Sequence, residues 1–210
     1  MTILAIDTAL GETSLTLSSD AEILAHLHHP ERDQQARMLL PWIESLLKKQ
    51  NIWYPELTGI AVCIGPGGFT GIRIGLATAR ALALAGNIPI AGFSTLEILA
   101  HYVACTRQET DVTALLPAGR GMVFHQTFNI VDQHPVARSE PSMLSPEEVT
   151  PFGITASTEP ALQPDVAVPI HTQATTLSHL AAGFPARFSE VSPAPLYIRP
   201  PDAKPQSSLL

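Results

Sequence analysis

The sequence predicts an α/β protein built from two lobes, and three observations support this. Strand and helix signals alternate over residues 1–107, the composition changes after that point, and most of the 19 prolines lie in the second half. Alternating elements are typical of a mixed β-sheet flanked by helices. We therefore predict a first lobe over residues 1–107 and a smaller, loop-rich second lobe over residues 108–210.

In the first lobe, residues 3–7, 13–17 and 22–29 read as strands, which together favour an antiparallel meander. Residues 33–50 change to helical spacing, with Pro41 inside the run, where it marks either a kink or the start of the helix. A buried strand follows at residues 58–64, then a glycine loop and a helix that ends near Gly86. The rest of the predicted elements are a strand at 88–91 and a helix that begins at the capping box of residues 94–97.

The second lobe gives weaker signals. Residues 115–116 and 122–130 read as strands, and residues 145–148 have the spacing of a second capping box. A proline-rich tail over residues 193–205 is expected to hold little regular structure.

The composition fits a globular chain and excludes two classes of function. Apolar residues make up 45% of the 210 positions and charged residues 15%. The net charge of −7 with only three lysines argues against a surface that binds nucleic acid by itself. The most apolar run, residues 72–85, is too short to span a bilayer and contains two arginines. Without a cationic leader, and with two cysteines in apolar contexts, the chain is expected in the cytoplasm.

The glycine loop GPGGFTGIRIG, residues 65–75, matches neither the P-loop nor the dinucleotide fingerprint. Two interpretations remain open. The free N–H groups at the start of the following helix could bind an anion, or Thr70 could cap that helix in a purely structural turn.

The helix at residues 72–85 is apolar or small at nearly every position, so we expect it to be covered on more than one side. Small residues recur every four positions and would let another helix approach closely: Gly71, Gly75, Ala79 and Ala83. Its second face packs either between the lobes or against another chain.

Three segments carry a resemblance to a known family. The stretches ILAIDTALGETSLTL, GPGGFTGIRIGLATARALALAGNIPIAGFSTLE and PLYIRPPDAK together resemble the TsaB (YeaZ) family, a glycoprotease-like branch of the actin-like superfamily (ASKHA, ribonuclease H-like). The match is dense over residues 1–100, sparse from about 108 to 190, and resumes at 195–204.

This resemblance implies two actin-like lobes, the second reduced, and a non-catalytic subunit of the machinery that makes threonylcarbamoyladenosine beside the tRNA anticodon. The subunit would pair with the catalytic paralogue TsaD and work with the ATPase TsaE, touching tRNA only through the complex and no membrane. Alone, it would form a homodimer. It would need no cofactor, with ATP or ADP bound only within the complex.

The resemblance also implies which residues matter. Asp7 and Thr8, with Gly65, Gly67, Gly68 and Thr70, would form a vestigial phosphate site, although Asp7 could instead cap the turn that follows it. The partner interface would lie on the first two helices, at Leu39, Trp42, Ile43, Leu46, Gly71, Arg73, Gly75, Leu76, Ala79 and Ala83. On that interpretation, Gly75→Glu would abolish pairing without unfolding the lobe.

Catalytic and metal-binding residues are not expected. TsaD enzymes hold a metal through two histidines four apart, and residues 33–50 contain no such pair. Family members often carry a histidine where Gln35 stands, and acidic residues where 117–124 reads PAGRGMVF. The alternative function is a nucleotide-binding kinase or ATPase of the actin-like class. A peptidase is discounted, because no nucleophile elbow is present.

Overall fold

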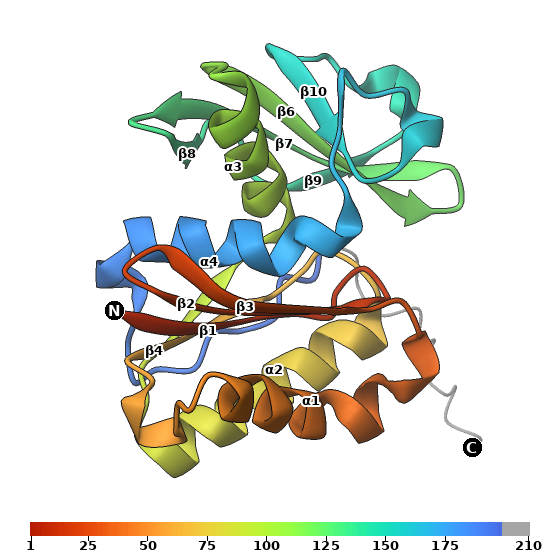
Figure 1. Cartoon of the computed structure of the whole chain (residues 1–210). Helices are drawn as coiled ribbons and strands as arrows, with labels where there is room; N and C mark the ends of the chain where they lie inside the picture. The colour runs from red at the N-terminus through yellow and green to blue at the C-terminus, as the bar shows by residue number, and fades with distance from the viewer. Residues whose placement is uncertain (199–210) are drawn as a thin grey trace, which may run out of the picture.

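The computed structural model describes residues 1–198, which fold into two sheets with helices between and beside them (Figure 1). From bottom to top in Figure 1, the layers are α1 with α2, the first sheet, α4, then α3 and the second sheet. Within the described residues, none of the helices is both long enough and apolar enough to cross a membrane.

The first sheet confirms the predicted antiparallel meander and adds two parallel strands. Its order is β3-β2-β1-β4-β5, with β1 at the centre between antiparallel β2 and parallel β4. The strand at its far edge starts two residues later than the sequence indicated, because Ile88 packs into the core ahead of the ladder. The five strands are β1 Thr2–Asp7, β2 Thr13–Ser19, β3 Glu22–His29, β4 Gly59–Cys63 and β5 Ile90–Phe93.

Two helices cover one face of this sheet, α1 over Gln35–Lys49 and α2 over Phe69–Gly86. Pro41 lies in the interior of α1, so the helix neither begins nor ends there. Apolar side chains of both helices interleave with those of β1, β2 and β4 to form the larger core of the first lobe.

The helices α3, Thr95–Arg107, and α4, Gln173–Gly183, lie between the two sheets. The predicted capping box of α3 is present, because Ser94 Oγ accepts from the Glu97 N–H at 3.0 Å. The sequence did not predict α4. It lies in the range assigned to the second lobe, yet it packs against β1 and β2 of the first sheet.

The second sheet has the order β11-β10-β6-β7-β8, with β9 paired to β7, and α3 packs on one of its faces. The two predicted strands lie within its two longest, whereas the four shorter ones carried no clear signal. At the second predicted capping box, Glu148 bonds back to Ser145, but it starts only a short 3-10 turn. Bounds are β6 Asp111–Gly119, β7 Met122–Val131, β8 His134–Ala137, β9 Ser142–Leu144, β10 Ile154–Ser157 and β11 Val166–Ala167.

The predicted proline-rich tail is described only in part. Residues 193–198 contain no helix or strand, as expected, and the remaining positions of the predicted tail, 199–205, lie outside the described residues.

Candidate functional site

The glycine loop and the turn between β1 and β2 are in direct backbone contact. Thr8 Oγ1 donates a hydrogen bond to Gly71 O at 2.7 Å, and the Gly68 N–H donates to Ala9 O at 2.7 Å. These bonds join residues about sixty positions apart in the chain. The N–H of Gly68, one of the glycines predicted for the phosphate site, is therefore occupied by the protein's own carbonyl.

The glycines on this side of α2 are required by close approach to Thr8. A Cβ atom on Gly71 would lie 2.0 Å from Thr8 O, and one on Gly75 would lie 2.3 Å from Thr8 Oγ1. Real Cβ atoms do not come so near to other heavy atoms, so any larger residue would push α2 away from the turn. Packing within the chain thus explains these two glycines without a bound ligand.

The start of α2 differs from the predicted N-cap. Gly68 is the N-cap and Phe69 the first helical residue, so Thr70 lies inside the first turn and is exposed. The helix begins earlier than the threonine signal indicated because the glycine loop closes against Ala9 before Thr70 is reached. Gly65 and Pro66 are anchored from α3, where the Thr95 N–H donates to Gly65 O and its hydroxyl donates to Pro66 O at 2.7 Å.

Asp7 lies beneath this loop and is buried. Its Oδ1 accepts the Ala9 N–H at 2.7 Å, which is the turn-capping contact of the two alternatives considered. Within residues 1–198, Oδ2 of Asp7 has no hydrogen-bond partner of normal geometry. Burial raises the pKa of Asp7 to about 6, while the bond from Ala9 and the neighbouring Cys63 thiol partly oppose that shift. The same burial, with the nearby carboxylate, raises the pKa of Cys63 well above its ordinary value.

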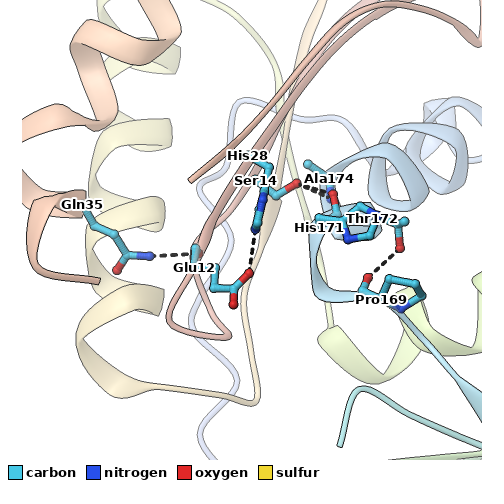
Figure 2. Close-up of polar contacts among 8 residues, drawn as sticks. All are labelled: Glu12, Ser14, His28, Gln35, Pro169, His171, Thr172 and Ala174. Atoms are coloured by element: carbon cyan, nitrogen blue, oxygen red, sulfur yellow. Dashed lines mark hydrogen bonds and ion pairs between the residues drawn. The ribbon is translucent and has the colours of Figure 1, made fainter. Parts of the chain in front are cut away.

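The turn between β1 and β2 is also held from two other sides (Figure 2). On one side, the buried Gln35 of α1 donates to Glu12 O at 2.9 Å, and the Glu12 carboxylate contacts His28 Nε2 at 2.6 Å. On the other side, Ser14 Oγ donates to His171 O at 3.2 Å and accepts the N–H of Ala174 at the start of α4 at 3.3 Å. Gln35, where the family often has a histidine, therefore fixes α1 to the turn.

The predicted interface residues on α1 lie inside the chain. The side chains of Leu39, Trp42, Ile43 and Leu46 are all buried in the core that α1 and α2 form on the first sheet. A buried side chain cannot contact a partner without leaving its core. An interface on these helices stays a prediction, but these four residues face the sheet.

The predicted interface residues on α2 are also buried, with one exception. Gly71, Gly75, Leu76, Ala79 and Ala83 are buried, whereas Arg73 is exposed. Sequence periodicity found that α2 has two apolar faces, but it assigned the partner to the face that packs on the sheet. The small residues every four positions let α2 approach β1 and the β1–β2 turn, as the contacts of Gly71 and Gly75 show.

The outer face of α2 is the apolar surface that remains available. Leu84 is 87% exposed and Phe69 42%, and three alanines lie exposed between or beside them. On α1, Leu40 is 44% exposed. We call this set the outer α2 face: Phe69, Arg73, Ala77, Ala81, Leu84 and Ala85. Of this set, the sequence predicted only Arg73 as an interface residue. It missed the others because the apolar residues other than Phe69 and Leu84 are alanines, which carry little hydrophobic signal.

The second lobe contains a separate open cavity of about 340 Å³ on its sheet. Leu115 and Val123 contribute apolar lining, and Asp165 contributes a carboxylate whose Oδ2 accepts two hydrogen bonds from Thr155. Those bonds lower the pKa of Asp165 below its ordinary value. Nothing in the sequence singled out these residues.

Two lobes with helices between their sheets, and a turn after the first strand that meets a glycine loop, define a protein of the actin-like (ASKHA) class. The profile of a family described as "TsaD: tRNA N6-adenosine threonylcarbamoyltransferase" matches residues 24–190. The chain belongs to this family.

Curated relatives and solved structures agree with the resemblance to TsaB (YeaZ). The chain is 36% identical over 124 residues to the tRNA threonylcarbamoyladenosine biosynthesis protein TsaB of Escherichia coli K12, covering 59% of this chain and 53% of that protein. It is 37% identical over 127 residues to TsaB of Bacillus subtilis 168, and the match covers 59% of this chain and 53% of that protein. The chain thus spans about half the length of the curated relatives it matches.

Solved structures extend the likeness to nearly the whole fold. YeaZ from Pseudomonas aeruginosa superposes with a TM-score of 0.82 at 26% identity, covering 93% of this chain and 99% of that one. An uncharacterized Pseudomonas aeruginosa protein, described as similar to the peptidase YeaZ, superposes with a TM-score of 0.83. The superposition covers 94% of this chain and 99% of that one.

Proposed function

We propose that the chain is a non-catalytic partner subunit in tRNA threonylcarbamoyladenosine biosynthesis, which pairs with the catalytic TsaD paralogue and activates it. The names of the relatives point to that pathway. The outer α2 face is the observation that carries the pairing, because an exposed apolar helix face next to a second helix is a typical docking surface. In the absence of the paralogue, the same face pairs two copies of this chain.

Two further parts of the proposal follow the family resemblance. The ATPase TsaE joins the complex, and the cytoplasm is the compartment in which it works. No cofactor is required by this subunit alone, and ATP or ADP binds only when the complex has formed. Contacts with tRNA lie mainly on the partner, since a net charge of −7 disfavours phosphate binding.

Co-purification with the TsaD paralogue of the same organism tests the pairing, with ATP and tRNA present. Wild-type chain should be retained, whereas Ala81→Glu should weaken binding about 100-fold by placing a charge in an apolar interface. Ala137→Glu, a matched change at an exposed end of β8, should bind like wild type. Failure of the wild-type chain to co-purify would refute the proposed pairing.

Activation is tested separately by threonylcarbamoyl transfer to tRNA. The paralogue should be active with the wild-type chain and lose that gain with Ala81→Glu. Transfer by the paralogue at full rate without this chain would contradict the role of activator, even if the two proteins bind.

The competing function, a nucleotide-dependent kinase or ATPase, is favoured by one observation, the buried Oδ2 of Asp7 with no normal hydrogen bond. The N–H of Gly68 argues against a nucleotide-dependent enzyme, because it donates to Ala9 O and is not available to a phosphate. Calorimetry with ATP and magnesium on the isolated chain discriminates between them. Our proposal expects no heat of binding at millimolar nucleotide, and saturable binding would favour the enzyme.

A further inference from the structure

The chain returns to α2 just before the described residues end. The Leu196 N–H donates to Ile64 O at 2.8 Å, beside the glycine loop. Arg80 Nη2 of α2 donates to Pro193 O at 2.5 Å, and Pro193 also packs so near Gly92 that a Cβ there would lie 2.6 Å from it. Residues 193–197, which we call the strap, are therefore held by Arg80 of α2 and by Ile64, and lie close to Gly92 of β5.

The strap places Tyr197 beside two residues of the outer α2 face. The rings of Tyr197 and Phe69 lie 5.3 Å apart, and the Arg73 guanidinium carbon lies 3.5 Å from the centre of the Phe69 ring. Arg73 Nε donates to the Tyr197 hydroxyl at 3.1 Å. Stacking and the hydrogen bond together fix a long cationic side chain that would otherwise be free to move.

This cluster remains accessible. Tyr197 is 40% exposed, Phe69 is 42% exposed, and Arg73 is exposed. The bond to Tyr197 uses Nε, so the two Nη groups, which carry most of the N–H donors of a guanidinium, take no part in it. Of the two charged residues of α2, Arg80 is committed to the strap, and Arg73 alone presents its charge on the outer α2 face.

The chemistry of the cluster selects a carboxylate with apolar surroundings. A planar guanidinium held against an aromatic ring pairs with a carboxylate through two parallel hydrogen bonds. Aromatic residues with an arginine are also the composition of energetic hot spots in protein interfaces, and the nearby alanines permit close approach around them. A phosphate of RNA is the less favoured ligand, because the chain as a whole carries a net charge of −7.

We propose that the strap completes the docking surface on α2 and holds Arg73 to receive an aspartate or glutamate of the catalytic paralogue. The inference rests on the proposed function and names the residues that decide affinity. It also gives a role to the segment PLYI at residues 195–198.

The test measures binding of the full-length chain to the paralogue by biolayer interferometry at two salt concentrations. Arg73→Gln should weaken binding about 30-fold and reduce its dependence on salt, because one ion pair is lost. Arg73→Lys should recover little, since lysine cannot form the two-bond contact. Tyr197→Phe, which keeps the ring and removes the hydroxyl, should weaken binding about threefold.

The controls separate this inference from the proposed function. Val131→Ala, an exposed site on β7, should bind like wild type, and circular dichroism should show that all variants are folded. Failure of wild type to bind the paralogue overturns the proposed function. Binding by wild type with equal binding by Arg73→Gln overturns only the inference. Loss of tRNA binding with unchanged paralogue binding would assign the cluster to RNA phosphate and likewise overturn it.

Discussion

The two sides of α2 are both built from apolar and small residues, yet they lie in different surroundings. The inner side, with Gly75, Leu76 and Ala79, packs on the first sheet and the β1–β2 turn. The outer side, with Ala81 and Leu84, is exposed. Similar composition thus serves two purposes, and only the position of the sheet decides which side stabilises the fold and which is available to a partner.

A charge on each side should separate the two roles most strongly. Gly75→Glu should destabilise the chain by at least about 4 kcal/mol, because its Cβ would meet Thr8 Oγ1 at 2.3 Å and its carboxylate would be buried. This replaces the expectation from sequence that the variant pairs poorly but stays folded. Ala81→Glu should change the free energy of unfolding by less than about 0.5 kcal/mol. Urea denaturation measures both, and similar losses would mean that α2 has no free side.

Two leucines on the same helix allow a milder version of that test. Leu76→Ala should cost about 3 kcal/mol, because it leaves a cavity in the core between α2 and the sheet. Leu84→Ala, at a side chain that is 87% exposed, should cost less than about 0.5 kcal/mol. Thermal unfolding of dilute protein is the appropriate measurement. A large cost at Leu84 that grows with protein concentration would show that a homodimer covers it.

The inner side should also make stability depend on pH, through Asp7. Its pKa rises from 3.8 to about 6 on folding, so the folded state binds the proton more tightly than the unfolded state. The resulting stabilisation is present below about pH 4 and is lost as the pH rises through 6. The loss of stability amounts to about 2 to 3 kcal/mol by pH 7. Asp7→Asn keeps an acceptor for the Ala9 N–H and should therefore be more stable than wild type at pH 8.

The comparison at low pH provides the internal control for Asp7. At pH 4 the folded wild-type carboxyl is mostly neutral, so the advantage of Asp7→Asn should largely disappear. Chemical denaturation across pH 4 to 8 measures the difference. An advantage of equal size at both ends of this range would show that burial of the charge is not its cause.

The sequence predicted most of the first lobe because its signals are local. Alternation in residues 13–17, helical spacing in 33–50 and the capping box at Ser94 each depend on neighbouring residues, and all three elements are present. The sequence did not predict α4, whose stretch QATTLSHLAAG contains buried Thr and Ser side chains. Their burial depends on distant partners, such as Ser18, whose hydroxyl lies 2.6 Å from that of Ser178.

The candidate site was predictable in outline, but of the outer α2 face only Arg73 was predicted as an interface residue. Glycine spacing located the loop, and the density of apolar residues showed that α2 has two apolar sides. To decide which side of α2 faces a partner, one must know where the sheet lies. That sheet pairs β1 with β4, whose residues are more than fifty positions apart in the chain. The cluster at Arg73 also depends on Tyr197, 124 positions away, and no local pattern connects them.

The position of α4 has a consequence for how this protein is made. Ile3 and Ala5 of β1 pack in one core with Leu177 and Leu180 of α4, which are synthesised more than 170 residues later. During synthesis, the face of the first sheet that α4 covers therefore stays exposed to solvent until residues 173–183 have been made. Premature termination before residue 173 would release a chain with that surface bare, which makes it a target for chaperones and proteases.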